Sequence, residues 1–286
     1  MGKIIALCAA LACAGMCGCA SRGSSGTDGL VLEGRAGRVV LDVHGGRMLS
    51  WRLPSGEEML FMPEQRESPD GDWSHGGISI CWPWFGKKGD AASSIHGFAR
   101  NRELTVRGSR IAADGASAVL GLSLAKGEVP DFPYAADMEL TVKVSDRLTM
   151  TLRTVNTGKE AFSFSNGFQP YFAVSGYRAV TLRGVKTQDF AAVDGMDAAF
   201  PRLGDGFALA DAGTGREIRA KARGNTGIVV WSPGNVEPHN RNLAAGDTER
   251  FIGMGPSNRV KEGPITLAPG QSHELLFELD CRRIRD

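Results

Sequence analysis

The chain has little cysteine outside its first residues, and this limits how it can be held together. Four of its six cysteines lie within residues 1–19, so only Cys81 and Cys281 remain in the body. Two cysteines cannot form the disulfide framework of a small secreted domain, although a single bridge between them stays open. Cys81 stands in an apolar run, where a free buried thiol is the commoner arrangement.

The chain also lacks an excess of charge of either sign. It carries 33 lysines and arginines against 32 aspartates and glutamates, and no block of five or more like charges. This balance argues against nucleic acid as a partner. The five histidines show no paired ligand spacing and the body has no CxxC, so we expect no metal site. We find neither a dinucleotide fingerprint nor a phosphate-cradling loop, and we expect no cofactor.

Long apolar runs are missing after the N-terminus, and no later segment is apolar enough to span a membrane. Lys3 precedes a small and apolar stretch at residues 4–16. This length is typical of a signal peptide and too short to cross a bilayer comfortably. The sequence therefore predicts export to the periplasm or cell envelope.

The end of this leader reads Cys-Gly-Cys-Ala-Ser at residues 17–21, and a tether rich in serine and glycine follows. The pattern resembles a bacterial lipobox, which would make Cys19 the lipidated N-terminus. Cys17 or Cys13 are alternative sites, and an ordinary cleaved signal is the other interpretation. We therefore expect an export signal at 1–19, a flexible tether at 20–28 and one domain at 29–286.

The body alternates polar and apolar residues over short stretches bounded by Gly, Asp, Asn and Pro. A period of two predicts half-buried strands, here at 38–43, 47–51, 118–124, 138–144, 147–152, 227–231 and 273–279. No amphipathic helical stretch exceeds a turn or two, and 38 glycines suit frequent turns and bulges. Many strands without intervening helices predict one all-β sandwich or barrel. The longest loops are expected at 63–77, 86–97, 186–215 and 232–250.

Several segments occur in the order in which one protein family has them. Residues 76–86 read GGISICWPWFG, and residues 96–100 read HGFAR. Shorter matching pieces lie at 46–51, 60–61, 132–134, 156–158, 170–172, 229–233 and 267–270. Together they resemble the hexose-6-phosphate mutarotases, or glucose-6-phosphate 1-epimerase-like proteins, whose first segment reads GGIPICFPWFG. The resemblance covers residues 30–280. It implies a large antiparallel β-sandwich, the galactose mutarotase-like supersandwich of the aldose 1-epimerases, with a sugar cleft on one sheet.

The family's reaction opens a pyranose and recloses it on the other face of the anomeric carbon. A base removes the proton of the anomeric hydroxyl while an acid protonates the ring oxygen, so two titratable groups are needed. By resemblance His96 orients the sugar, and Arg100 contacts a phosphate or a sugar hydroxyl through its planar fork. The alternatives are a histidine bonded to its own turn and a structural arginine.

Both members of the acid–base pair are replaced in this sequence. Gln169 stands where the family has its acid histidine, and an amide does not titrate. Gly255 stands within one position of the base glutamate and offers no side chain. Each such loss typically lowers the rate by about 10²–10⁴-fold. We therefore expect a sugar-binding relative with little or no mutarotase activity by the family mechanism.

Other departures supply further candidates. His75 replaces the arginine that usually precedes the two glycines in phosphate-binding members. An unperturbed histidine is only partly charged at neutral pH, so phosphate affinity should fall, although His75 could also act as a new acid–base group. Asp189 lies near a family acidic position, and Glu237 and His239 lie in a late loop. Solvated loop side chains are the favoured interpretation of these three.

Two tryptophans flank Pro83 in the GGISICWPWFG segment. Alternation should place Trp82 and Trp84 on one face, where Trp84 either stacks on a sugar ring or packs in the core. The expected partner is a hexose or hexose phosphate, with membrane contact only through a lipid anchor. Three functions stay open: an altered mutarotase, a non-catalytic carbohydrate-binding envelope lipoprotein, and an envelope protein with a vestigial cleft.

Overall fold

The structure is a computed structural model that describes residues 29–64, 75–88, 95–232, 243–244, 246–259 and 263–284. Strands dominate these residues. The helical elements among them are three-residue 3₁₀ turns, namely η1 (Ala99–Asn101), η2 (Tyr177–Ala179) and η3 (Asp247–Glu249). The predicted all-β fold class is therefore confirmed. Cys19, with the rest of the predicted leader and tether, lies outside the described residues.

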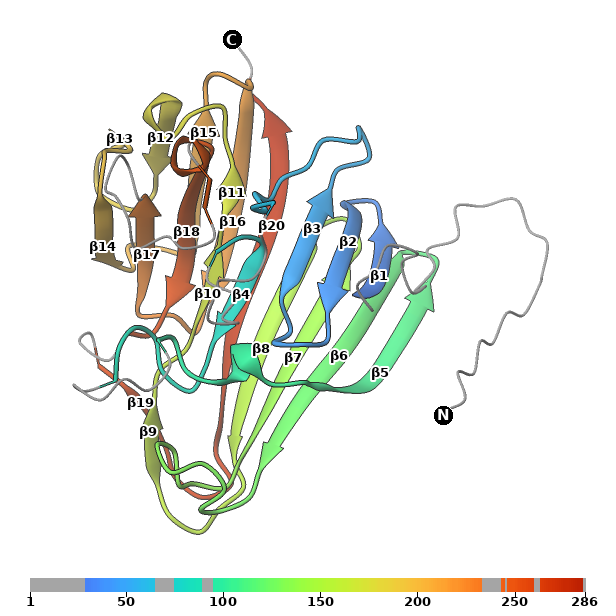
Figure 1. The fold of residues 1–286 in the computed structure, drawn as a ribbon, viewed down its shortest axis with the longest axis vertical. Helices are drawn as coiled ribbons and strands as arrows, with labels where there is room; N and C mark the ends of the chain where they lie inside the picture. The colour runs from blue at the N-terminus through green and yellow to red at the C-terminus, as the bar shows by residue number, and fades with distance from the viewer. Residues whose placement is uncertain are drawn as a thin grey trace, which may run out of the picture.

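Two large antiparallel sheets form the domain (Figure 1). Sheet I has the order β1-β2-β3-β4-β10-β18-β17-β14, and β11 also pairs with β18. Its strands are β1 (Gly29–Gly34), β2 (Gly37–Asp42), β3 (Met48–Arg52), β4 (Ile78–Cys81), β10 (Gly167–Pro170), β11 (Phe172–Ala173), β14 (Met196–Pro201), β17 (Gly227–Ser232) and β18 (Phe251–Ser257).

Sheet II has the order β13-β12-β15-β16-β20-β8-β7-β6-β5. Its strands are β5 (Thr105–Ala112), β6 (Gly115–Leu124), β7 (Ala136–Val144), β8 (Leu148–Asn156), β12 (Val180–Arg183), β13 (Phe190–Ala191), β15 (Gly206–Asp211), β16 (Arg216–Arg223) and β20 (Ser272–Arg283). A small ladder joins β9 (Phe162–Phe164) to β19 (Ile265–Leu267). In Figure 1 strands β1 to β3 lie in front of the long strands β6 to β8.

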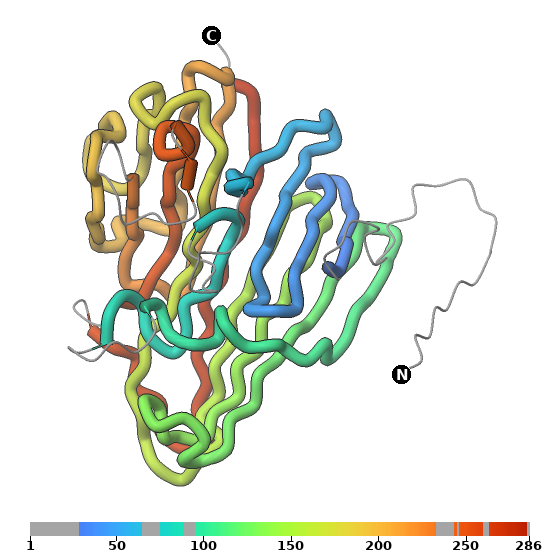
Figure 2. Tube along the Cα trace, in the orientation of Figure 1, coloured from blue at the N-terminus to red at the C-terminus, as the bar shows by residue number. Residues whose placement is uncertain are grey.

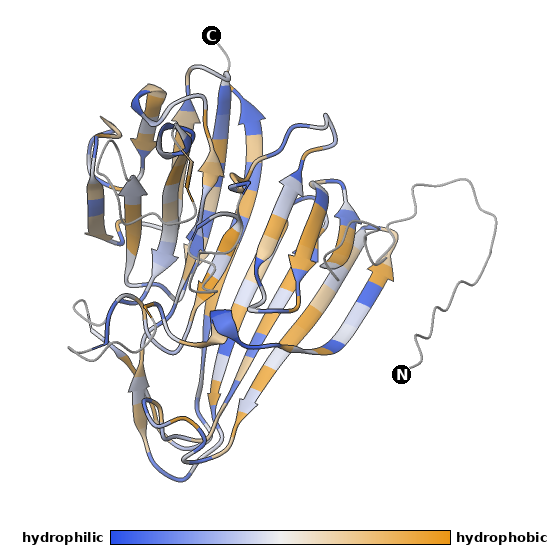
Figure 3. Cartoon of the chain, viewed as in Figure 1, coloured by the Kyte–Doolittle hydropathy of each residue, from blue (hydrophilic) through white to orange (hydrophobic). Residues whose placement is uncertain are grey.

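The strands form because every second residue is apolar and one face of each sheet is buried. Burial alternates strictly along β8, and Figure 3 shows the same alternation of hydropathy along the long strands of sheet II. The inward side chains of both sheets form one core. Within it the Phe168 ring of β10 stacks on Phe277 of β20 at 5.6 Å between centroids, and Phe277 stacks on Phe207 at 6.2 Å.

The last strand completes sheet II. β20 pairs with β16 on one side and with β8 on the other, so strands far apart in the sequence lie side by side (Figure 2).

Two expectations about local structure need correction. The predicted loop at 186–215 contains β13, β14 and β15, because their short segments pair at or near the sheet edges although their alternation is weak. The open alternative of a disulfide is not realised. Cys81 lies in β4 of sheet I, Cys281 lies in β20 of sheet II, and both are free thiols. Burial raises the pKa of Cys81 to about 12, so this thiol stays protonated and inert.

Candidate functional site

The outer face of sheet I, which points away from the core, carries most of the predicted site residues. Ile78 and Ile80 of β4 belong to the core, so Ser79 and Cys81 point to the outer face. Phe168 of β10 is also in the core, which turns the neighbouring Gln169 outward.

Strand register brings together on this face the two residues that the resemblance assigns to the acid and base positions. Gln169 of β10 lies opposite Ser79 of β4. On its other side β10 pairs with β18 through Gly167 and Ser257, and this antiparallel register places Gln169 opposite Gly255. The acid and base positions of the resemblance are therefore neighbours on one face, and neither carries a titratable group.

Gly255 also has no room for a side chain. A Cβ on this residue would lie 2.2 Å from the carbonyl oxygen of Phe168 and 2.6 Å from Cδ of Pro170. Both distances are far inside van der Waals contact, so β10 approaches β18 more closely than any residue but glycine allows. A carboxylate at this position would require the two strands to move apart.

His96 is fixed as a neutral hydrogen-bond donor. It has φ of 67°, in the left-handed region, and its backbone N–H donates to the Gly86 carbonyl at 2.9 Å. The Gly86 N–H in turn donates to His96 Nδ1 at 3.1 Å. Burial, followed by the positive charge of Arg100, lowers the pKa of His96 to about 3. With Nδ1 accepting, the single ring proton sits on Nε2 and is available for donation.

Three arginines make the region around His96 electropositive. Arg100 lies in η1 with 7% of its surface exposed, and Arg47, just before β3, is 3% exposed. Burial raises the pKa of the Cys81 thiol, and the positive charges of both arginines partly offset this rise. Both arginines therefore lie near the outer face of β4, to which Cys81 points. Arg259, just after β18, lowers the pKa of His96 together with Arg100. This positive field suits an anionic group on a ligand.

An aromatic wall borders the same face, formed by His75, Tyr171, Trp231, Phe251 and Phe61. The His75 ring stacks on Trp231 at 5.5 Å and meets Tyr171 edge-on at 5.8 Å. The charge of His75 also lowers the pKa of His96, so the two histidines lie near each other. Aromatic faces of this kind suit the C–H surfaces of a sugar ring.

Phe85 connects the HGFAR turn with the sheet. Its ring meets His96 edge-on at 4.8 Å, and its Cδ2 would lie 2.5 Å from a Cβ placed on Gly167. The phenylalanine therefore lies directly over β10, beside the row that contains Gln169. Its backbone N–H donates to Ser165 Oγ at 2.9 Å, which holds this segment to the residues just before β10.

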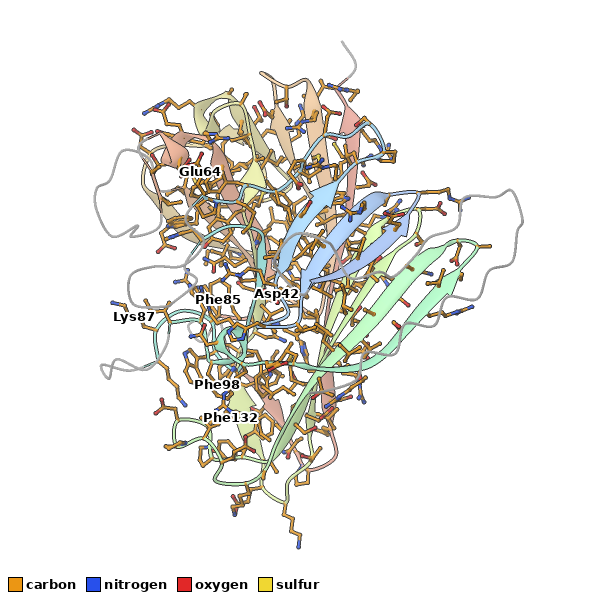
Figure 4. The ribbon with its side chains drawn as sticks, turned by 45° about the vertical axis from the view of Figure 1, so that its right-hand side comes forward. Asp42, Glu64, Phe85, Lys87, Phe98 and Phe132 are labelled. Atoms are coloured by element: carbon orange, nitrogen blue, oxygen red, sulfur yellow. The ribbon has the colours of Figure 1, made fainter. Side chains whose placement is uncertain are left out.

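The structure does not bring every candidate to this face. Trp84 is 3% exposed and lies in the main core against Phe98, 5.6 Å away between ring centroids, which favours the packing alternative. Figure 4 labels Phe98 below Phe85, close to Phe132. Asp189 is exposed beside β13, at the edge of sheet II, and pairs with Arg183 at 3.3 Å.

The late-loop candidates Glu237 and His239 lie outside the described residues. Within the described ranges, no three His, Cys, Asp or Glu side chains cluster as a metal site would require. No helix in the part of the chain that the structure describes is long and apolar enough to cross a membrane.

Sequence reasoning missed Arg47, Arg259 and Ser79. Arg47 lies in the first matching segment at a position that the family pattern does not specify. The resemblance therefore did not point to it. Ser79 did leave a signal, because it replaces the proline of GGIPICFPWFG. Strand register then places it beside Gln169.

Two surface hollows of about 530 Å³ each lie elsewhere. One lies on sheet II over β15, β16 and β20, and the other lies on sheet I over β2, β3 and the segment that follows β3. Neither is lined by His96, Gln169 or Gly255. Phe61 of the aromatic wall also lines the hollow on sheet I, so that hollow adjoins the candidate face, whereas the hollow on sheet II does not. The face around His96 combines cations, a neutral donor and an aromatic wall, which equips it to hold a sugar with an anionic group.

Known proteins are similar to this chain in sequence or in fold. A protein of Cenchrus ciliaris named "Putative glucose-6-phosphate 1-epimerase" is 27% identical over 277 residues, covering 86% of this chain and 82% of its own. A protein of the same name from Escherichia coli K12 is 23% identical, covering 67% of this chain and 69% of its own.

Solved structures confirm the predicted mutarotase-like sandwich. A "putative mutarotase" of Salmonella typhimurium has a TM-score of 0.80 at 19% identity and covers 90% of both chains. A galactose mutarotase-like protein of Lactobacillus casei has a TM-score of 0.71 at 14% identity, covering 89% of this chain and all of its own. The sequence model described as "Aldose 1-epimerase" matches residues 30–194, more than half of the chain. The chain belongs to the aldose 1-epimerase family.

Proposed function

We propose that this protein binds a hexose or hexose phosphate on the outer face of sheet I without efficient anomer exchange. The observation that carries the proposal is the strand register that places Gln169 opposite Gly255. The resemblance assigns the family's acid and base to these two positions. Neither residue can exchange a proton with a sugar near neutral pH. The nearby arginines and aromatic rings remain, and they are groups that hold a ligand rather than transform it.

The neutral state of His96 supports binding in preference to acid catalysis. A general acid works best with a pKa near the operating pH, and the pKa of His96 is about 3. At pH 7 the ring carries no proton that it can release to a ring oxygen. It can still donate a hydrogen bond from Nε2, which matches the orienting role that the resemblance implies.

An anionic hexose is the form that the site charges favour. The replacement of arginine by His75 predicted weak phosphate binding, but Arg47 Nη1 donates to the His75 carbonyl at 3.4 Å and so brings a cation to the same place. Relatives of this chain carry the name "Putative glucose-6-phosphate 1-epimerase". We therefore choose glucose 6-phosphate as the first ligand to test, with glucose as its neutral counterpart.

A second candidate function is a mutarotase that uses His75 in place of the lost acid. What favours it is the position of His75 near His96, against Tyr171 and Trp231. This second function predicts that the wild-type protein accelerates anomer exchange. It also predicts that His75→Ala lowers the exchange rate to that of a protein-free sample while the variant still binds the sugar. The binding proposal predicts that the wild-type protein does not accelerate anomer exchange.

Calorimetric titration and polarimetry separate these functions. Titration with glucose 6-phosphate should give saturable binding that weakens at least about tenfold in Arg100→Ala, because a charge-assisted contact contributes about 1.5–3 kcal/mol. In polarimetry, the optical rotation of the freshly dissolved α-anomer should change at the same rate with the protein as without it. Catalysis that is lost in His75→Ala or His96→Ala would overturn the binding proposal. Absence of both binding and catalysis would leave only a vestigial cleft.

We also propose that the protein is exported and anchored through a lipid on Cys19. The support is the sequence of residues 1–21 alone. Mass spectrometry of the membrane fraction should find an acylated N-terminal cysteine, and Cys19→Ala should move the protein to the soluble fraction. A soluble wild-type protein without acyl mass would contradict the anchor.

A further inference from the structure

Two buried polar groups on the outer face of sheet I have no partner among the described residues, and they face each other. Ser79 Oγ and Gln169 Oε1 are both covered from solvent and make no hydrogen bond. They belong to directly opposed residues of β4 and β10. Leaving such a group unpaired costs about 1–3 kcal/mol, so two neighbouring cases call for a physical reason.

The two groups are chemically complementary. A serine hydroxyl donates one hydrogen bond, and an amide oxygen accepts. Opposed residues of an antiparallel pair have Cβ atoms about 4.5–5.5 Å apart, within reach of such a bond after a change of side-chain rotamer. Ser79 is 1% exposed and donates to no other group in the part of the chain that the structure describes, whereas Gln169 keeps some exposed surface.

The surroundings place this pair in the middle of the candidate sugar site. The next row on one side contains Gly77 and Tyr171, joined by the Tyr171 N–H to the Gly77 carbonyl at 2.8 Å. The next row on the other side contains Cys81 and Gly167, which Phe85 covers. The pair therefore lies between the aromatic wall and the His96 turn.

We propose that Ser79 is a positioning residue for Gln169 in the liganded protein. The Ser79 hydroxyl donates to Gln169 Oε1, which turns the amide so that its Nε2 donates to an oxygen of the bound hexose. Gln169 is then the residue that touches the sugar, and Ser79 acts through it. This inference rests on the proposed function, because it requires a sugar on this face.

A positioning role for Ser79 accounts for two neighbouring differences from the family pattern, at positions 79 and 169. The resembling family segment has proline at position 79 and histidine at position 169. A proline has no hydroxyl and cannot orient an amide. A glutamine at 169 gains a fixed direction only with a donor beside it, which serine supplies.

Calorimetric titration with glucose 6-phosphate tests the inference in single and double variants. Ser79→Ala should weaken binding about fivefold, and Ser79→Thr, which keeps a hydroxyl, should bind within about twofold of wild type. Gln169→Ala should weaken binding at least as much as Ser79→Ala. In the Gln169→Ala background Ser79→Ala should have no further effect, because the two residues act as one unit.

Ser232→Ala is the matched control. Ser232 is also buried with an unpartnered hydroxyl, but it follows Trp231 on β17 and so faces the other side of the sheet. Its loss should leave sugar affinity unchanged. Urea unfolding of the free variants should show all three alanine substitutions neutral or stabilising, since each removes an unsatisfied group.

The outcomes distinguish this inference from the proposed function. If the wild type binds and Ser79→Ala binds equally well, the positioning role is wrong while the proposed function stands. The same holds if the losses in Ser79→Ala and Gln169→Ala simply add. If the wild type binds neither glucose 6-phosphate nor glucose, the proposed function is overturned and the inference falls with it.

Discussion

At the scale of single residues, His96 shows how a turn sets the chemistry of a side chain. Its Nδ1 is occupied by the Gly86 N–H, and burial with nearby cations keeps the ring neutral. The sequence motif was sufficient to single out this histidine. Its protonation state was not predictable, because it depends on Arg100 and Arg259, which reach it only in the folded chain.

The lowered pKa of His96 makes stability depend on pH. Between about pH 6.5 and 3 the unfolded chain protonates this residue and the folded protein does not. The unfolded state then binds more protons, so the free energy of unfolding falls as pH is lowered across this window. His96→Asn removes the effect and retains a residue that tolerates positive φ.

Urea unfolding between pH 7 and 4 checks this expectation. The wild-type free energy of unfolding should fall more steeply than that of His96→Asn, by at most about 1.4 kcal/mol per pH unit. Parallel curves for the two proteins would show that the histidine titrates equally in both states.

Gly255 gives a second prediction at this scale. Gly255→Glu should destabilise the protein by about 1–3 kcal/mol or more, because its Cβ has no space between β10 and β18. Anomer exchange should not appear in this variant. Gly204→Glu is the control, since a Cβ on Gly204 meets nothing within 4 Å. Equal stability of both variants would contradict the close approach of the strands.

At the scale of elements, alternation located strands of different lengths and missed those within residues 186–215. Strands such as β7 and β8 bury every second residue, and that pattern is visible in the sequence. β13 and β15 depend on partners brought from elsewhere in the chain, so local sequence gives little sign of them. The row that joins Ser79 to Gln169 was equally hidden, because it depends on the pairing of β4 with β10.

β20 holds the two sheets together, and its central phenylalanine tests this role. Phe277 is fully buried and stacks between Phe168 of sheet I and Phe207 of sheet II. Phe277→Ala should lower the free energy of unfolding by about 3–5 kcal/mol. Ile111→Ala on β5, where the side chain is 46% exposed, should change it by less than about 0.5 kcal/mol. Similar losses in urea unfolding would refute the central place of β20.

At the scale of the whole molecule, the chain has the fold of its family but differs from the family pattern at residues on the candidate face. The motifs that identify the aldose 1-epimerase family also build the observed face, with the HGFAR turn beside β4 and β10. Gln169 and Gly255, which the resemblance assigns to the acid and base positions, lie opposite each other on that face. We propose on this ground that the chain binds a sugar on this face with little anomer exchange.

One measurement tests this proposal directly. Proton NMR of glucose 6-phosphate with the purified protein reports contact and anomer exchange in the same sample. We predict saturation transfer from the protein to the sugar protons, with exchange between α and β anomers no faster than in a protein-free sample. Exchange clearly above that background, or absence of saturation transfer, would contradict the account.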